Sequence, residues 1–281
     1  METAEQIKEI VKEKYGQIAN QPKEQNQKSC CGSGSCTSGN YSIFSEDYSR
    51  LEGYNKEADL GLGCGIPTQF ANIQEGNIVI DLGSGAGNDA FVVRSIVGEK
   101  GKVLGIDMTE AMIEKARMNN ENLGFNNVEF RLGEIEKIPS TSNVADVVVS
   151  NCVLNLVPDK AKAFSEIHRV LKNGGHFCIS DIVLAGNIPD ILRKHADMYA
   201  GCVSSAIQKT EYLAHIKNAG FANIEIKKEK VLTIPDDILQ EYLTKEELEL
   251  FKNSKTEIQS ITVYAEKHSK KSCCEPNSGC C

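Results

Sequence analysis

The 281-residue sequence lacks the features of a membrane protein, a secreted protein or a nucleic-acid scaffold. No apolar run approaches the ~18–20 residues of a membrane-spanning helix. Residues 1–19 do not show the basic and then apolar pattern of a signal peptide. The net charge of −8 disfavours general nucleic-acid binding, which needs a basic surface. Because no heptad pattern indicates assembly either, we expect a cytoplasmic monomer with no membrane or nucleic-acid partner.

The 11 cysteines lack the spacings of a zinc site, since the sequence has no Cys-x-x-Cys pair and no His-x(3–5)-His pair. An odd number cannot all pair within one molecule, and a reducing compartment keeps most cysteines as thiols. We therefore expect roles as ligands, nucleophiles or redox groups. The cysteines form an amino-terminal group, a central group and a carboxyl-terminal group: Cys30, Cys31 and Cys36; Cys64, Cys152, Cys178 and Cys202; and Cys273, Cys274, Cys280 and Cys281.

Composition divides the chain into four regions. The first contains an apolar stripe typical of a helix, capped by Thr3 with Gln6 as its partner, and then a polar segment rich in Gln, Ser and Gly. No internal repeat occurs. The predicted regions are 1–40, a helix and mobile cysteine loop; 41–185, the main α/β domain; 186–266, a part that completes the sheet and the site; and 267–281, a disordered cysteine-rich tail.

Continuous Val/Ile runs alternate with helical patterns from residue 77 onward, which indicates an α/β fold with a parallel, doubly wound sheet. Further helices and strands follow the fifth strand. The predicted strands are 78–82, 102–107, 128–132, 145–150, 176–183, 224–233 and 258–266. The predicted helices are 88–97, 109–123, 160–171 (ended by Asn173-Gly174-Gly175), 188–200, 210–219 and one that begins at Thr244.

A glycine-rich loop, Gly83 to Gly87, directly follows the first of these strands. Such a turn lets a ligand approach the backbone at the carboxyl edge of a sheet. A dinucleotide fingerprint would need glycine at position 88, where this chain has Asn88, and Asp81 instead precedes the loop. Asp107 ends the second strand, where a carboxylate can accept both ribose hydroxyls. The alternative is a glycine turn that serves only strand–helix packing and binds no ligand. The loop, the acid and the strand order all agree with a ligand-binding loop, which favours that interpretation.

Asp-x-Gly-x-Gly-x-Gly with this second acid resembles the class I S-adenosylmethionine-dependent methyltransferases. The resemblance implies a Rossmann-like, mostly parallel sheet with an antiparallel edge strand, and S-adenosylmethionine as cofactor. It assigns the methionine part to Asp81, Gly83, Ser84, Gly85 and Gly87, the ribose to Asp107, and the adenine to Met108 with Glu134 and Ile135 beside it. We also expect Asn151, after the fourth strand, to line this cofactor site.

Three central cysteines lie at predicted loop edges around one cleft. Cys152 directly follows the fourth strand, Cys202 follows a helix able to cover the same crevice, and Cys64 lies between glycines. Cys178 alternates within a strand and is expected in the core. Core packing is the alternative for each of the other three, since cysteine is often buried. Together they favour a site for a soft, thiophilic centre.

Four segments resemble the arsenite methyltransferase family: Gly53-Tyr54 with Ala58 to Pro67, Asp81 to Asp89, Ser150 to Leu156, and Gly201 to Ser204. The resemblance implies that Cys152 and Cys202 bind As(III), that Cys64 joins them, and that an amino-terminal cysteine takes part in capture or disulfide chemistry. We take this to be Cys31. Cys30 stays open as an alternative, and Cys36 fits less well.

The resemblance implies methyl transfer from S-adenosylmethionine to thiolate-bound trivalent arsenic, for arsenic detoxification. Arsenic(III) keeps a lone pair, so no proton need be removed, and the sequence offers no His/Asp base couple near the cleft. A disulfide between Cys64 and the amino-terminal cysteine would be reduced by thioredoxin or a glutathione-like thiol. Alternatives are a small-molecule C- or N-methyltransferase, and a thiol-rich protein that sequesters metalloid. The tail cysteines either scavenge metalloid or are dispensable.

Overall fold

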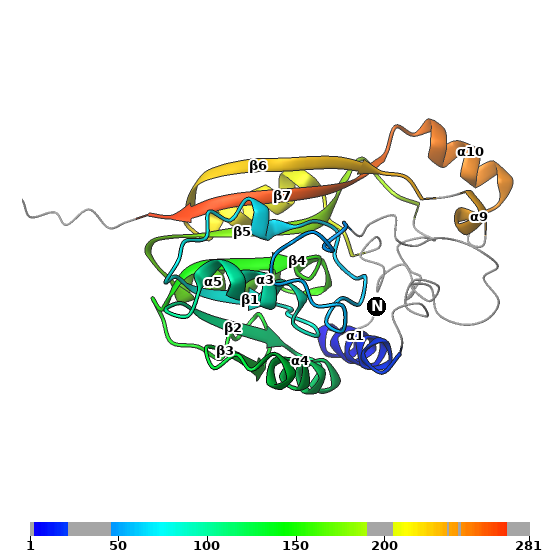
Figure 1. Ribbon diagram of the computed structural model, residues 1–281. Helices are drawn as coiled ribbons and strands as arrows, with labels where there is room; N and C mark the ends of the chain where they lie inside the picture. The colour runs from blue at the N-terminus through cyan, green and yellow to red at the C-terminus, as the bar shows by residue number, and fades with distance from the viewer. Residues whose placement is uncertain (1–2, 22–45, 190–204, 235, 241–242, 269–281) are drawn as a thin grey trace, which may run out of the picture.

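One seven-stranded sheet with helices on both faces forms the centre of the molecule (Figure 1). The computed structural model describes residues 3–21, 46–189, 205–234, 236–240 and 243–268. The strands lie in the order β3-β2-β1-β4-β5-β7-β6. Their bounds are β1 Ile78–Leu82, β2 Lys102–Asp107, β3 Val128–Leu132, β4 Ala145–Asn151, β5 Leu171–Ala185, β6 Phe221–Leu232 and β7 Glu257–Lys267.

The sheet is mostly parallel, as the sequence predicts. β1 to β5 pair in parallel, whereas β7 runs antiparallel to both of its neighbours, β5 and β6. Antiparallel pairing is therefore confined to one edge of the sheet. Strand order reverses at β1, which has β2 on one side and β4 on the other. In open α/β sheets, ligands bind at the carboxyl ends of the strands beside such a switch point.

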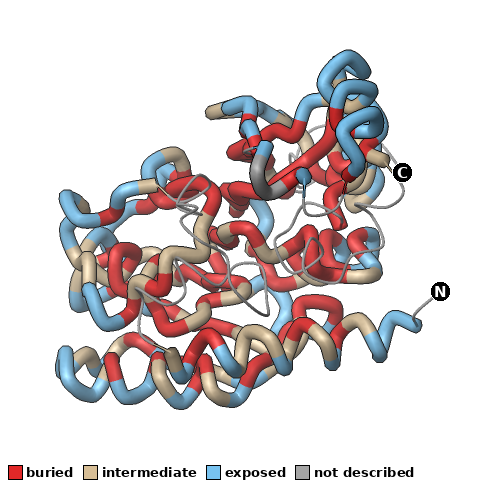
Figure 2. Tube along the Cα trace, turned by 90° about the vertical axis from the view of Figure 1, so that its right-hand side faces the viewer, coloured by how far each residue is buried: buried red, intermediate tan, exposed pale blue. Residues whose placement is uncertain are grey.

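Alternate side chains of each central strand pack against different helices, because successive residues of a strand point to opposite faces. Val79 lies in the cluster formed with α3 and α4, and Ile80 in the cluster formed with α5 and α8. Figure 2 shows the buried residues concentrated inside the molecule. The helices are α1 Ala4–Ala19, η2 Pro67–Gln69, α3 Asn88–Val97, α4 Glu110–Leu123, η3 Leu154–Leu156, α5 Lys160–Val170, α8 Lys209–Asn218, α9 Asp236–Leu239 and α10 Lys245–Asn253.

The junction of α5 and β5 differs from the prediction. Asn173-Gly174-Gly175 does not end a helix but lies within β5, which begins at Leu171 directly after α5. Leu171 pairs with Ala145 and His176 with Val147, so β5 bulges between them, and Gly174 has a φ of 80°. A glycine pair can serve a bulge as well as a helix end. The local pattern did not distinguish the two.

The last strand is longer than predicted. β7 includes Lys267, which the composition places at the start of the tail. The Lys267 ammonium is buried and donates to the carbonyl oxygens of His168 and Leu171, both at 2.7 Å. These bonds fasten the end of the strand to the end of α5. Most of the predicted helix 188–200, residues 22–45 and the tail beyond 268 lie outside the described residues.

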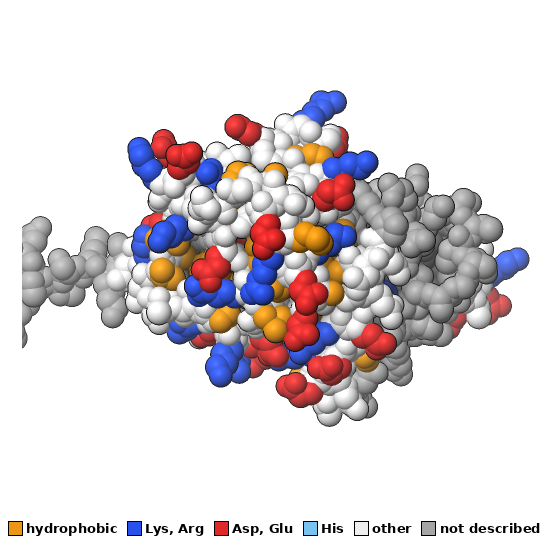
Figure 3. Space-filling model, turned by 60° about the horizontal axis from the view of Figure 1, so that its bottom comes forward, with side chains coloured by type: hydrophobic (Ala, Val, Ile, Leu, Met, Phe, Trp, Pro, Cys, Tyr) orange, Lys and Arg blue, Asp and Glu red, His pale blue; other side chains and the backbone are white. Residues whose placement is uncertain are grey.

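Charges of both signs are mixed on the surface. On the face viewed in Figure 3, Asp and Glu side chains alternate with Lys and Arg side chains, and the described residues there form no continuous basic patch. Within the part of the chain that the structure describes, no helix has both the length and the apolar character to cross a membrane.

Candidate functional site

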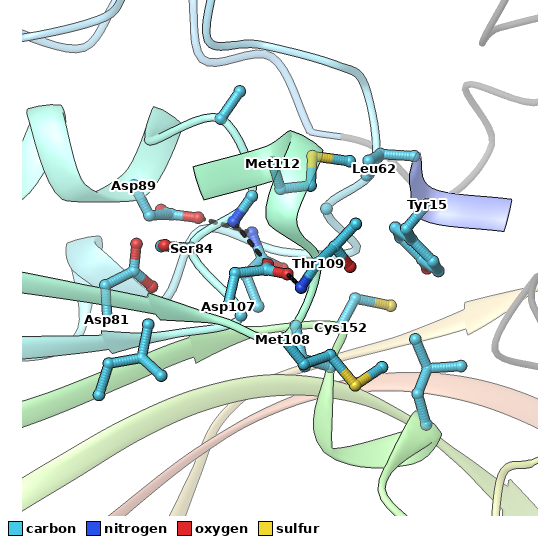
Figure 4. Close-up of a pocket in the computed structure, with 18 of the residues that line it drawn as sticks. Tyr15, Leu62, Asp81, Ser84, Asp89, Asp107, Met108, Thr109, Met112 and Cys152 are labelled. Carbon is cyan, nitrogen blue, oxygen red and sulfur yellow. Dashed lines mark hydrogen bonds between the residues drawn. The ribbon is translucent and has the colours of Figure 1, made fainter. Parts of the chain in front are cut away.

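A deep pocket lies at the carboxyl ends of β1, β2 and β4, at the switch point of the sheet (Figure 4). Residues of the glycine loop line this pocket. Gly83 has a φ of 68°, and a Cβ there would lie 2.3 Å from a Val153 methyl group. Glycine is therefore required both by backbone conformation and by close packing. The predicted residues that line the pocket are Asp81, Gly83, Ser84, Gly85, Asp107, Met108, Glu134, Ile135 and Asn151. Gly87, the N-cap residue of α3, is not among the lining residues.

Asp107 holds the loop and the second strand together. One of its carboxylate oxygens accepts a hydrogen bond from the Gly85 N–H at 3.0 Å, and the other accepts from the Thr109 N–H at 2.9 Å. Figure 4 shows these bonds at the centre of the pocket. Backbone donors therefore fix the carboxylate before any ligand arrives.

Three of the acidic residues that line the pocket have a raised pKa: Asp81, Asp89 and Asp107. Burial is the main cause that raises the pKa of each, to about 6 for Asp89, and the charges of Asp89 and Asp107 further raise the pKa of Asp81. No ion pair among the described residues includes any of the three. Such a site favours a positively charged ligand, which restores the ionised forms.

Several buried polar atoms in the pocket have no hydrogen-bond partner within the described residues. They are Asp81 Oδ2, Ser84 Oγ and Asn88 Oδ1. Buried polar groups in native proteins are almost always satisfied, so these atoms point to a polar ligand. Ammonium and hydroxyl groups can donate to these atoms, and S-adenosylmethionine carries both of them beside its positively charged sulfonium.

Helix α1 closes one side of the pocket through Lys8, Val11 and Tyr15. The Lys8 ammonium lies 2.7 Å from a Glu134 carboxylate oxygen and 3.2 Å from a Glu136 oxygen. The helix begins with the predicted capping box of Thr3 and Gln6, which is confirmed. The amino-terminal segment is therefore part of the pocket wall.

Cys152 lines the pocket and has a strained backbone. Its φ is 62°, a left-handed conformation that is uncommon for residues other than glycine. Its N–H donates to the Ser180 carbonyl at 2.8 Å, which holds the turn after β4 in place. In Figure 4 the thiol lies on the side of the pocket where Tyr15 and Met108 are found. Strained backbone conformations cluster at active sites and ligand-binding sites.

Cys64 is 2% exposed and is not one of the lining residues. It nevertheless shares a hydrophobic cluster with Cys152. Its N–H donates to Asn151 Oδ1 at 3.1 Å, and its carbonyl accepts from Ser260 Oγ at 2.7 Å. The predicted thiols Cys64 and Cys152 are thus packed into one region of the fold.

The remaining predicted cysteines divide into one that the structure describes and several that it does not. Cys178 is fully buried in the core, where burial raises the pKa of its thiol to about 12, so its predicted structural role is confirmed. Cys202 and Cys31, and likewise Cys30 and Cys36, lie outside the described residues. Among the described residues, no group of three His, Cys, Asp or Glu side chains could hold a metal ion.

Comparison with known proteins relates this geometry to a family. A model of a methyltransferase domain family matches residues 73–220. An arsenite methyltransferase of Aquipseudomonas alcaligenes is 31% identical over 84% of this chain and 68% of its own length. The chain belongs to the arsenite methyltransferase family. Another member, from Halobacterium salinarum, is 41% identical over 79% of this chain, but the chain spans only 59% of that protein.

A solved structure of the same family supports the fold. The arsenic(III) S-adenosylmethionine methyltransferase of Chlamydomonas reinhardtii is 34% identical, with a TM-score of 0.61 over 72% of this chain and 66% of that one. The predicted class I methyltransferase fold is therefore confirmed.

Several residues that line the pocket of this family member were not indicated by the sequence. Asp89 follows the glycine loop by two residues, and its acidic position in the first turn of α3 could have singled it out. Lys8, Tyr15 and Tyr48 also line the pocket. They come from segments far away in sequence, and no local pattern relates them to the pocket.

Proposed function

We propose that the protein transfers the methyl group of S-adenosylmethionine to trivalent arsenic held by cysteine thiolates, as a step in arsenic detoxification. One observation carries this proposal: the strained Cys152 lies in the wall of the same pocket as the glycine loop and Asp107. A thiophilic ligand and a cofactor would then share one chamber.

The acidic pocket supports S-adenosylmethionine as the cofactor. Asp81 and Ser84 offer unsatisfied polar atoms for its methionine part, and Asp107 lies at the strand end where a ribose is held. Met108 and Ile135 offer an apolar wall to the adenine. When bound, the cofactor supplies an electrophilic methyl group on a positively charged sulfur.

Three thiols would bind the arsenic substrate: Cys152, Cys64 and Cys202. Ile188 and Ala206, on either side of the segment that carries Cys202, belong to the hydrophobic cluster of Cys64 and Cys152. Cys202 precedes Ala206 by four residues, which span at most ~14 Å. The assignment of Cys202 to the arsenic rests on the resemblance to the arsenite methyltransferase family. Soft thiolate ligands suit a soft trivalent centre.

Reduction between rounds would use thiol chemistry. Transfer of a methyl cation to the arsenic lone pair raises the formal oxidation state from As(III) to As(V), so two electrons must return. Oxidation of two thiols to a disulfide, with loss of two protons, supplies them. We propose Cys64 and Cys31, with Cys30 as the alternative, and a cytoplasmic thioredoxin or glutathione-like thiol as the external reductant. The chain would act as a monomer.

Methyl-labelled S-adenosylmethionine tests the proposed activity. Purified protein is incubated with arsenite, a thiol reductant and the labelled cofactor, and label on arsenic is counted. Label is expected with the wild type and with Cys178→Ser, whose thiol is in the core, and a loss of about 100-fold or more is expected with Cys152→Ser. Arsenic bound without label would instead favour sequestration. Unchanged transfer to an organic acceptor by Cys152→Ser would favour a small-molecule methyltransferase.

A further inference from the structure

The turn that begins with Cys152 is bonded at both of its ends to β5. At its start, the Cys152 N–H donates to the Ser180 carbonyl at 2.8 Å. At its end, the backbone N–H of Asn155 donates to the side-chain carboxylate of Asp181. Asn155 follows Cys152 by three positions, and Asp181 directly follows Ser180. Two consecutive residues of one strand therefore fix the start and the end of the turn.

Lys160 holds the same turn from another side. Its ammonium donates to the backbone carbonyl of Asn155 at 3.0 Å and to that of Val157 at 3.1 Å. Asn155 thus has its N–H bonded to a carboxylate and its carbonyl bonded to an ammonium. Asp181 is 0% exposed and Lys160 is 8% exposed. Burial raises the pKa of Asp181, and the charge of Lys160 opposes that rise, so the two charged groups also act on each other.

These two charged side chains do not belong to the pocket wall. Cys152 and Leu156, on either side of Asn155, line the pocket, whereas Asn155, Lys160 and Asp181 are not among the lining residues. Asn155 is 0% exposed, so the middle of the turn is directed into the protein. Asp181 and Lys160 can therefore affect chemistry in the pocket only through the turn that they hold.

The arrangement includes two unfavourable features that meet at this turn. Cys152 has a left-handed backbone, with a φ of 62°, and such a conformation persists only where the surrounding structure fixes it. Burying charged side chains such as Asp181 and Lys160 is unfavourable as well, and apolar side chains of similar volume often stabilise a fold equally well. What these side chains do provide is a fixed backbone beside the Cys152 thiol.

We propose that Asp181 and Lys160 are positioning residues that hold the turn after β4, so that the Cys152 thiol stays in the wall of the cofactor pocket. Without them, the strained backbone of Cys152 would relax, and the thiol would leave the place where arsenic bound to it meets the methyl donor. The inference rests on the proposed function in taking Cys152 as a ligand of that arsenic. Neither positioning residue touches cofactor or arsenic.

Thiol alkylation tests this role without arsenic. The wild type and the variants are treated with iodoacetamide, and labelling of Cys152 and Cys178 is followed by peptide mass spectrometry. In Asp181→Ala and in Lys160→Met, Cys152 should be labelled on the order of tenfold faster, because the turn opens more often. Cys178, in the core, should keep its wild-type rate. If Asp181→Ala does not fold, Lys160→Met decides the outcome alone.

Two control variants separate this role from general damage. Lys267→Met is the matched lysine control, since the Lys267 ammonium is also buried and donates to two backbone carbonyls, but at the amino end of β5, away from the pocket. Tyr212→Phe removes the hydroxyl that donates to Asp181 at 3.1 Å and leaves the carboxylate to accept from Asn155. Both controls should label Cys152 at the wild-type rate.

Methyl transfer gives a second readout. At saturating S-adenosylmethionine and arsenite, turnover should fall on the order of tenfold in Asp181→Ala and in Lys160→Met, because the methyl acceptor is no longer held in line with the donor. Turnover of Lys267→Met should match that of the wild type.

Four results would overturn the positioning role. They are a wild-type labelling rate of Cys152 in Lys160→Met, equal acceleration in Lys160→Met and Lys267→Met, acceleration of Cys178 as large as that of Cys152, and faster labelling with unchanged turnover. A wild type that transfers no methyl group to arsenic would contradict the proposed function instead, while the labelling rates would still decide whether the two residues hold the turn.

Discussion

At the scale of single residues, burial raises the pKa of several carboxyl groups. Asp181 is fully buried on β5, accepts from the Tyr212 hydroxyl at 3.1 Å, and has its pKa raised to about 7, chiefly by burial. Between about pH 4 and pH 7 the folded protein keeps a proton that the unfolded chain has lost. This group therefore makes the protein less stable as pH rises through that window, and its contribution is constant above it.

Replacing Asp181 with asparagine should remove this pH dependence. Going from pH 5 to pH 8, the free energy of unfolding of the wild type should fall relative to that of Asp181→Asn by roughly 2–3 kcal/mol. Urea denaturation at the two pH values measures the difference. The asparagine can still accept from the Ile182 N–H, so the variant is close in shape. Parallel pH profiles for the two proteins would show that Asp181 is ionised in the fold at pH 5.

At the scale of elements, a buried ion pair fixes α1 at the pocket, beside the apolar contacts of Val11 and Ile18. Lys8 is 7% exposed and bridges Glu134 and Glu136, which lie in the loop after β3. Lys12, one turn later, has its ion pair among the described residues with Glu9 of the same helix, at 3.4 Å. The sequence predicts the helix and its cap from local pattern. It does not predict the site of docking, because Lys8 and Glu134 are 126 positions apart.

Lys8→Ala should loosen α1, whereas Lys12→Ala should not. Loss of Lys8 leaves Glu136 buried without its partner, and the cost should be about 1–3 kcal/mol, between the values for exposed and buried ion pairs. Amide hydrogen exchange over residues 4–19 should become faster in Lys8→Ala, and S-adenosylmethionine should bind more weakly. Lys12→Ala should change stability by less than about 0.5 kcal/mol. Equal effects of the two substitutions would contradict a docking role for Lys8.

At the scale of the whole molecule, local patterns predict the sheet and the glycine loop, and they fail where distant segments meet. β1, β2 and β3 have the predicted bounds, because Val/Ile runs with turn residues at both ends specify buried strands. The β5 bulge was misread as a helix end, since glycines serve both. Tyr48 reaches Asn151 across 103 positions, and no local signal could reveal that contact.

The cysteines show the same division between local and distant information. Position after β4 predicts that Cys152 lies at the pocket, and the structure places it in the pocket wall. The left-handed backbone of Cys152 and the hydrogen bonds around Cys64 arise only from tertiary packing. The proposal that arsenic is the substrate rests on the family and on these thiols together, because this fold carries many chemistries.

X-ray absorption at the arsenic edge tests the central claim most directly. The claim is that Cys152, in the wall of the cofactor pocket, binds the arsenic that receives the methyl group. Protein loaded with one equivalent of arsenite in the presence of S-adenosylhomocysteine should show arsenic bonded to three sulfur atoms. Cys152→Ser should show fewer sulfur neighbours, with oxygen in their place, and Cys178→Ser should match the wild type. An arsenic coordination unchanged by loss of Cys152 would contradict the account.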